Sequence, residues 1–227
     1  MEEERGPIYK ERAVLTVDLV HSSGNIMDYE ALQELHGRDI VEDFRRMIEG
    51  YMQKFSAIGP LDWAGEGLIS YFETNDRVLN AFMAGRKILA DIHEFNIVHR
   101  CELGLRLSLH CGRLPQVEDP SRITSEVITL ACNLLACAYP NEMLITDKAR
   151  SHLEILSPQA ISLLSRRTVA LPKRVGGLRA LDVWSYCLTK APKEARVQQL
   201  LDQAVREVVK DIFGEGYIVY KPDGRPL

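Results

Sequence analysis

Residues 61–72 read LDWAGEGLISYF and place one acidic residue, Glu66, between two glycines. The stretch before the glycines is typical of an extended strand, and residues 68–72 alternate as the next strand would. Gly65 and Gly67 carry no Cβ, so they tolerate the backbone of a tight turn. The segment therefore predicts a β-hairpin with Glu66 at its tip, directed into solvent or toward a ligand.

A second acidic residue, Asp18, lies near the end of the apolar run AVLTVDLV and is followed by the polar segment HSSGN. If the two strands are neighbours, Asp18 and Glu66 lie at adjacent strand ends. Two carboxylates in that position are suitable oxygen ligands for Mg²⁺ above a triphosphate. The simpler interpretation is that Glu66 only keeps the hairpin tip soluble.

Composition limits the class of protein. The chain has 227 residues, 46% of them hydrophobic, and a net charge of −4, which fits one α/β domain with a sizeable core and a short extension. We find no basic cluster suited to nucleic acid, no apolar run long enough for a membrane span, and no signal peptide in the charged start MEEERGPIYKER. Five cysteines without metal-type spacing favour a reducing cytoplasm.

The patterns along the chain predict an α+β sandwich with a mixed or antiparallel sheet. We expect helices from about 29 to 55, where Gly37 could divide the helix, and from Asn75, with Asn75 or Asp76 as the cap. The alternation in ELGLRLSLH predicts a strand that Gly112 ends. The other expected elements are, in order, strand 12–20 at the start and, after Gly112, helix 124–138, strand 143–146, helix 147–156, strands 168–173 and 180–186, and an amphipathic helix over 192–213.

The sequence also predicts the environment of two further pairs of side chains. Cys132 and Cys137 lie in the apolar helix ITLACNLLACAY and are expected to be buried thiols. His110 and Cys111 are neighbours in one strand, so they should point to opposite faces and cannot chelate one ion.

Four segments, taken together, resemble the class III nucleotidyl cyclase domain, also called the adenylate/guanylate cyclase homology domain. VDLVHSS resembles the strand with the first metal aspartate, and GEGLISYF resembles the G-D-G hairpin with the second. LRLSLHCG is similar to the family's R-x-G-I-H-x-G strand, and ITLACNLLACAYPNEMLIT to V-N-x-A-x-R-L…P-G-E-I-L-I-S. The resemblance covers residues 12–187, between a charged arm (1–11) and a C-terminal helix and tail (188–227).

The resemblance implies a ferredoxin-like core and a head-to-tail homodimer with nucleotide sites at its interface. It also implies conversion of a nucleoside triphosphate to its 3′,5′-cyclic monophosphate and pyrophosphate with two Mg²⁺ or Mn²⁺ ions per site. Asp18 matches the first metal carboxylate, the backbone carbonyl of Leu19 the adjacent ligand, and Glu66 the second aspartate. Glu66 is one methylene longer, and Mg²⁺ prefers near-ideal octahedral geometry, so this residue would shift the ion or require a bound water. The change is expected to weaken the site without abolishing it. Ser22 and Ser23 lie in the segment that would wrap the phosphates with backbone N–H groups.

Other positions depart from the family pattern. Where the family has an Asn that orients the ribose and, four residues later, an Arg that stabilises the transition state, this chain has Thr129 and Asn133. Loss of one such donor commonly costs about 10²–10³ in rate. Lys173 resembles the family's phosphate lysine, although a solvated charge in a strand loop is an equal alternative.

Two positions read the nucleotide base in the family that this chain resembles. Here they are Asp62 and Arg122, and this pair fits neither the family's adenylate pattern nor its guanylate pattern. An acceptor and a forked donor can serve uracil or guanine, or they can pair with each other. The sequence thus leaves two hypotheses. One is an active cyclase with an unusual base pocket, including a pyrimidine (UTP or CTP) cyclase. The other is a pseudo-cyclase that acts as a dimeric nucleotide-binding or regulatory module.

Overall fold

The structure is a computed structural model that describes residues 8–21, 38–64, 67–116, 125–172 and 178–187, with the backbone alone at 21, 38–39, 59–64, 172 and 178. The chain divides into two compact units, residues 1–188 and 189–227. All the described residues belong to the first unit. The predicted helix over 192–213 lies outside them.

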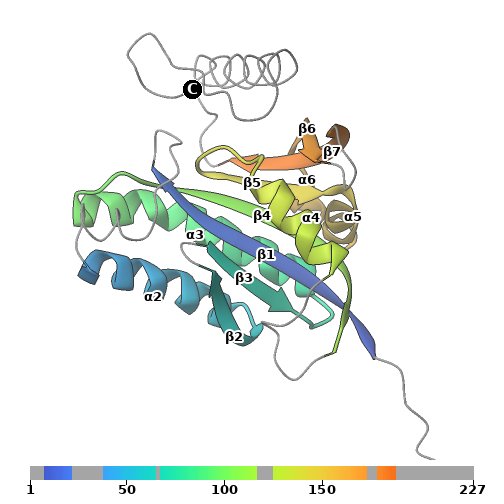
Figure 1. The fold of residues 1–227 in the computed structure, drawn as a ribbon, viewed down its shortest axis with the longest axis horizontal. Helices are drawn as coiled ribbons and strands as arrows, with labels where there is room; N and C mark the ends of the chain where they lie inside the picture. Colours follow the sequence, from blue (N-terminus) through green and yellow to red (C-terminus); the bar gives the residue numbers. More distant parts are fainter. Residues whose placement is uncertain (1–7, 22–37, 65–66, 117–124, 173–177, 188–227) are drawn as a thin grey trace, which may run out of the picture. The chain divides into compact units, whose positions relative to one another are not determined.

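The first unit is built on a seven-stranded mixed sheet in the order β2-β3-β1-β4-β5-β7-β6 (Figure 1). The strands are β1 (Tyr9–His21), β2 (Ala57–Ala64), β3 (Gly67–Phe72), β4 (Leu103–Pro115), β5 (Glu142–Thr146), β6 (Ser165–Pro172) and β7 (Leu178–Cys187). The helices are α2 (Arg38–Lys54), α3 (Arg77–His99), α4 (Glu126–Leu135), α5 (Asp147–Leu156) and α6 (Pro158–Ile161). In this described part β4 and β5 pair parallel and the other neighbours antiparallel, which confirms the expected α+β class and the mixed sheet.

The structure corrects several predicted boundaries. β1 starts at Tyr9 instead of 12, and β4 continues past Gly112 to Pro115, because the two strands pair along their whole length from Tyr9↔Pro115 to His21↔Leu103. Asp76 is the N-cap of α3, as expected, but its side chain makes no capping hydrogen bond. The short helix α6 was not predicted. Of the helix predicted over 29–55, the described part is α2.

Alternation along β1 separates the two faces of the sheet. Ala13, Leu15, Val17 and Leu19 are buried in one large core with apolar residues of α2, α3 and α5. Their positions alternate because successive strand side chains point to opposite faces. The helices reach this core through residues at helical spacing, such as Val41, Phe44, Ile48 and Met52 of α2.

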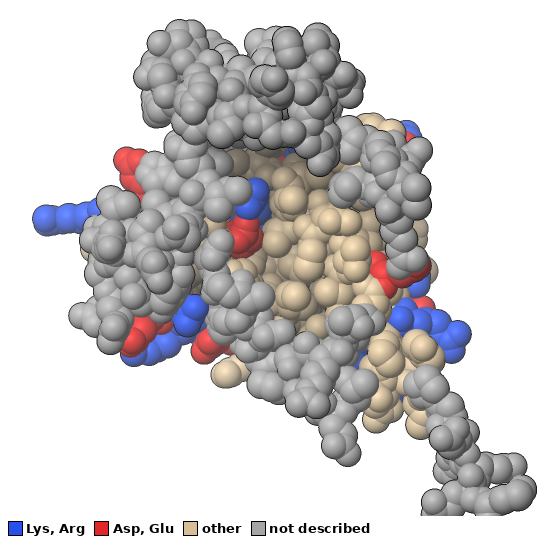
Figure 2. Space-filling model, viewed as in Figure 1, with Lys and Arg blue, Asp and Glu red and all other residues tan. Residues whose placement is uncertain are grey.

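The opposite face of the sheet is covered by α4 over part of its area. Val14 and Ala131 pack there with Tyr71 and Leu114 in a smaller apolar cluster. Figure 2 shows a broad uncharged surface in the middle of the described part when the molecule is viewed as in Figure 1. Asp18 belongs to this second face, since it is two residues beyond Thr16 and four beyond Val14.

The helix α4 approaches β4 closely at Gly112. A methyl group at position 112 would lie 2.6 Å from Cγ2 of Val127, which is well inside van der Waals contact. This contact gives the glycine of the LRLSLHCG segment a packing role instead of the strand-ending role expected from the sequence.

We expect Gly112→Ala to destabilise the protein by about 1–3 kcal/mol, because α4 must shift away from the sheet. Gly50 in α2 is a matched control, since a methyl group there meets nothing within 4 Å. Gly50→Ala should stabilise by about 0.5–1 kcal/mol through helix propensity. Urea unfolding of both variants measures the two effects. Equal stability of Gly112→Ala and the wild type would show that the contact is not tight.

Candidate active site at the ends of β1, β3 and β4

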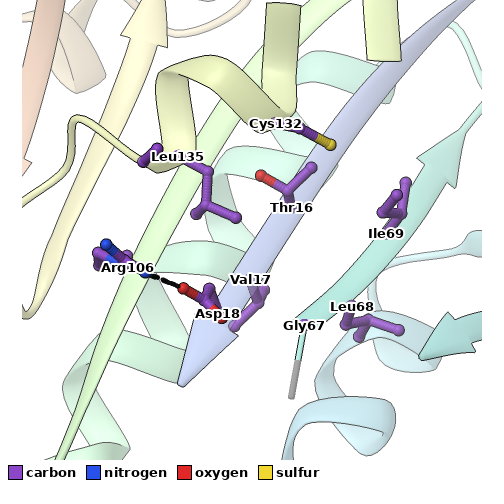
Figure 3. Close-up of a pocket in the computed structure, with 10 residues that line it drawn as sticks. Thr16, Val17, Asp18, Gly67, Leu68, Ile69, Arg106, Cys132 and Leu135 are labelled. Carbon is purple, nitrogen blue, oxygen red and sulfur yellow. Dashed lines mark hydrogen bonds and ion pairs between the residues drawn. The ribbon is translucent and has the colours of Figure 1, made fainter. Parts of the chain in front are cut away.

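A pocket of about 260 Å³ opens on the face of the sheet that carries α4. Side chains from three strand segments form one wall, and residues of α4 and its C-terminal end form the other (Figure 3). The lining residues are Thr16, Val17, Asp18, Gly67, Leu68, Ile69, Arg106, Cys132, Leu135 and Ala136. Most of the lining is apolar, and Asp18 and Arg106 supply its charged groups.

The register of β1 and β3 brings Asp18 next to the predicted hairpin. Asp18 pairs with Gly67, and Ala64 of β2 pairs with the same Gly67, so residues 65–66 connect the two strands. The expectation that the two acidic residues belong to neighbouring strands is met at the level of strand order. Glu66 itself lies outside the described residues, so the convergence of the two carboxylates stays a prediction.

Arg106 of β4 lies on the other side of Asp18. Its Nε is 3.1 Å from Oδ2 of Asp18, and Nη2 contacts the same oxygen (Figure 3). No role was predicted for Arg106 from the sequence. The signal that could have found it is its position in β4: Arg106 shares a strand face with Ser108 and His110, and that face meets the Asp18 side of β1 once the two strands are aligned.

Helix α4 presents different residues to the pocket from those that the sequence singled out. Cys132 lines the pocket, but Thr129 and Asn133 do not. Thr129 is exposed and its hydroxyl donates to the carbonyl of Ser125 at 3.0 Å. Asn133 follows Cys132, so it is turned about 100° around the helix axis. Within one chain, the structure therefore does not bring Thr129 or Asn133 to Asp18.

The remaining predicted site residues are placed in part or not at all. The Leu19 side chain is buried in the core, which leaves its backbone as the group that could serve a ligand. The backbone of Asp62 pairs in register with Ile69, which lines the pocket. Ser22, Ser23, Arg122 and Lys173, like Glu66, lie outside the described residues.

The expectation of buried thiols is wrong for Cys132. This residue is exposed beside the pocket, and Cys137 is half-buried with its thiol 3.5 Å from the carbonyl of Ala170. The apolar residues of α4 itself lie on more than one face of the helix, so their spacing in the sequence does not indicate which face meets the sheet. Desolvation by the surrounding residues raises the pKa of the Cys132 thiol, which keeps it protonated near neutral pH.

His110 and Cys111 are both buried, and Cys111 belongs to the core of the opposite face, as expected. His110 Nδ1 lies 2.8 Å from the hydroxyl of Thr146, and burial lowers the pKa of His110 to about 4. A neutral, buried histidine bonded to a hydroxyl has a structural role here.

A buried chain of hydroxyl groups links the floor of the pocket to α4. Ser108 Oγ donates to the carbonyl of Ala131 at 2.7 Å, and Thr16 Oγ1 lies 2.7 Å from Ser108 Oγ. Because the single proton of Ser108 is used on Ala131, Thr16 must donate to Ser108. The family pattern has glycine at position 108, so in this chain the serine adds a polar anchor for the helix.

The chemistry of Asp18 fits a divalent cation in part. Its carboxylate is the hard oxygen ligand that Mg²⁺ and Mn²⁺ prefer, at a strand end that borders an open pocket. Among the described residues, no group of three or more His, Cys, Asp or Glu side chains could hold a metal ion. A cation at Asp18 would therefore need Glu66, backbone carbonyls, water or substrate oxygens as further ligands. A cation at Oδ2 would also have to replace Arg106 there.

Comparison with known proteins supports the fold on structural grounds. No protein family model and no curated protein sequence matches this chain. Solved structures do. The adenylyl cyclase CyaB from P. aeruginosa matches with a TM-score of 0.62 and 13% identity, covering 82% of this chain and 98% of that one. The adenylate/guanylate cyclase/hydrolase from Silicibacter pomeroyi matches with a TM-score of 0.59 and 16% identity, covering 81% and 99%.

A third match is the guanylate cyclase domain of RhGC from Catenaria anguillulae, whose structure is a complex with GTP. Its TM-score is 0.58 at 9% identity, and the match covers 79% of this chain and 98% of that one. This protein thus has the fold of the class III adenylyl and guanylyl cyclase domains, as the four sequence segments indicated. At identities this low, the matches establish the fold and leave the activity to be inferred from the site.

We expect Ser108→Ala to destabilise the protein by about 1–3 kcal/mol, because it leaves the buried hydroxyl of Thr16 without its acceptor. Replacing both groups, as in Thr16→Val with Ser108→Ala, should cost less than the sum of the single changes. Ser151, whose hydroxyl bonds the carbonyl of Asp147 on the exposed side of α5, is the control and should change stability by less than about 0.5 kcal/mol when replaced by alanine. Chemical denaturation tests the set, and strictly additive effects would argue against the hydroxyl chain.

Proposed function

We propose that this protein is a nucleotide cyclase that converts a nucleoside triphosphate to a 3′,5′-cyclic nucleotide and pyrophosphate. The observation that carries the proposal is the position of Asp18. It lies near the end of β1, in a pocket, and in register with the residue that follows Glu66. The cyclase fold supports the same function independently of these residues.

Different residues in and around the pocket would bind the metal ions and the phosphates of a triphosphate. Asp18 and Glu66, with the carbonyl of Leu19, would hold two Mg²⁺ or Mn²⁺ ions, which in such sites lower the pKa of a bound hydroxyl and neutralise phosphate charge. Arg106 presents a forked cationic donor at the same end of the pocket, where it can bind phosphate oxygens in two-point contacts. The segment with Ser22 and Ser23 and the side chain of Lys173 would complete phosphate binding.

The apolar part of the pocket is the place for a base or a ribose. Leu68, Ile69 and Leu135 line it, and Asp62 pairs along the backbone with Ile69. We propose that Asp62 and Arg122 read the base, and that a pyrimidine such as uracil is a substrate candidate beside guanine. The support for this is the exchange of charge at these two positions relative to the adenylate and guanylate patterns.

The position of Thr129 and Asn133 supports a homodimer. In one chain these residues do not line the pocket that contains Asp18, so a role at an active site requires the pocket of a second chain. We propose a homodimer with the nucleotide at its interface and residues 12–187 as the cyclase-homology domain. No described helix is long and apolar enough to cross a membrane. The reducing cytoplasm indicated by the cysteines remains our proposed location.

The alternative is a pseudo-cyclase, a nucleotide-binding or regulatory module without turnover. It is favoured by the contact of the Thr129 hydroxyl with its own helix and by the lack of an arginine at position 133. The two functions make different predictions for the same ligands. A pseudo-cyclase would be stabilised against heat by a nucleoside triphosphate without converting it.

Incubation of the protein with ATP, GTP, CTP or UTP and Mn²⁺ or Mg²⁺ should yield the cyclic monophosphate of at least one base, identified by mass. Asp18→Asn should reduce this product to background, because it removes a charged metal ligand. Asp43→Asn, which breaks an exposed ion pair with Arg46 on α2, should leave the rate unchanged. Product formation by Asp18→Asn at the wild-type rate would refute the proposed function.

Restoring an arginine on α4 should raise turnover. We expect Asn133→Arg to increase kcat by roughly 10²-fold, the lower end of what a preorganised charged donor commonly contributes. Asn133→Gln, which lengthens the side chain without adding charge, should leave kcat near the wild-type value. Steady-state kinetics with the preferred nucleotide measures both, and an unchanged kcat in Asn133→Arg would mean that position 133 does not reach the reacting phosphate.

A further inference from the structure

Arg106 is bonded to the Asp18 carboxylate, which the proposed function assigns to a divalent cation. Its Nε lies 3.1 Å from Oδ2 of Asp18, and its Nη2 contacts the same oxygen. The side chains of Arg106 and Asp18 are 16% and 15% exposed, so this ion pair is largely protected from solvent screening. Asp18 is therefore already neutralised by a residue of its own chain.

The contact is fixed by the backbone. Asp18 and Arg106 are direct partners in the antiparallel ladder of β1 and β4, and Arg106 is the direct partner of Glu142 in the parallel ladder of β4 and β5. Direct partners present their side chains on the same face of a sheet. Asp18, Arg106 and Glu142 thus form a row of alternating charge across three neighbouring strands.

We propose that Arg106 is a displaceable counter-ion, which holds the cation site closed until a divalent cation competes it away from Asp18. This inference rests on the proposed function, because it takes Asp18 as the metal ligand. A guanidinium and a divalent cation cannot both contact Oδ2, and their like charges repel strongly at contact distance. Cation binding at Oδ2 of Asp18 is therefore coupled to the release of Arg106.

The row of charges gives the released guanidinium a second acidic neighbour. Glu142 is fully buried and is held by the hydroxyl of Ser185, the guanidinium of Arg167 and, at 2.7 Å, the backbone N–H of Tyr139. Its carboxylate stays in place because these donors are fixed by β6, β7 and the turn before β5. Because Arg167 already neutralises Glu142, the released guanidinium of Arg106 would lie beside a polar, hydrogen-bonded ion pair, which costs less than exposure to an apolar wall.

The test is a titration of the full-length protein with Mn²⁺ alone, without nucleotide, in which free Mn²⁺ is followed by electron paramagnetic resonance. Arg106→Gln should bind Mn²⁺ about tenfold more tightly than the wild type, since one competing ion pair is removed. Arg106→Lys, which keeps the charge but loses the fork, should fall between them. Arg150→Gln is the control for net charge, because Arg150 pairs with Glu154 on α5, which packs on the opposite face of the sheet.

Asp18→Asn separates this inference from the proposed function. In the Asp18→Asn background, Arg106→Gln should no longer tighten Mn²⁺ binding. Wild-type affinity in Arg106→Gln, or tightening that persists without Asp18, would overturn the competition even if cyclic nucleotide is formed. Conversely, tightening that depends on Asp18 supports it even if no triphosphate is converted. Circular dichroism of each variant verifies the fold, and Arg106→Lys carries the comparison if Arg106→Gln is unfolded.

Discussion

The antiparallel pairing of β1 with β4 is the constraint on which the rest of the structure depends. It runs over 13 residues of each strand and places both at the centre of the sheet. Its register decides which residues of β1 enter the core under α2 and α3 and which face α4. It also places Asp18 opposite Arg106 and Thr16 opposite Ser108, so the same ladder organises the core, the anchor of α4 and the charged end of the pocket.

Local patterns were enough to predict the fold class and most of the described elements, although not α6. The alternation in β1 and β4, the glycines around Glu66 and the helical spacing in α2 and α3 each depend on a few neighbouring residues. Helix and strand limits were less accurate, because the strands extend as far as their partners do. Gly112 illustrates this: the sequence marks it as the end of a strand, whereas its lack of a side chain serves the approach of Val127.

The sequence singled out Asp18, which lines the pocket, but it did not indicate which side chains surround that residue. Asp18 was identified because it interrupts an apolar strand near its end. Its partner Arg106 is 88 residues away, and their contact depends on the strand order and register, which no local pattern specifies. Cys132 was assigned to the wrong environment for a similar reason, since the exposed side of an apolar helix is decided by the sheet that it packs on. The convergence of Asp18 and Glu66 remains a hypothesis.

The row formed by Asp18, Arg106 and Glu142 limits how the chain can change in length. Inserting or deleting one residue in β1 or β4, between the start of the strand and this row, would turn every following side chain of that strand to the other face of the sheet. A one-residue deletion in β1 before Asp18, for example, would turn Asp18 toward the apolar core and bring Leu19 to its place in the pocket. Length variation among functional versions of this protein should therefore be restricted to connections that carry none of the proposed site residues.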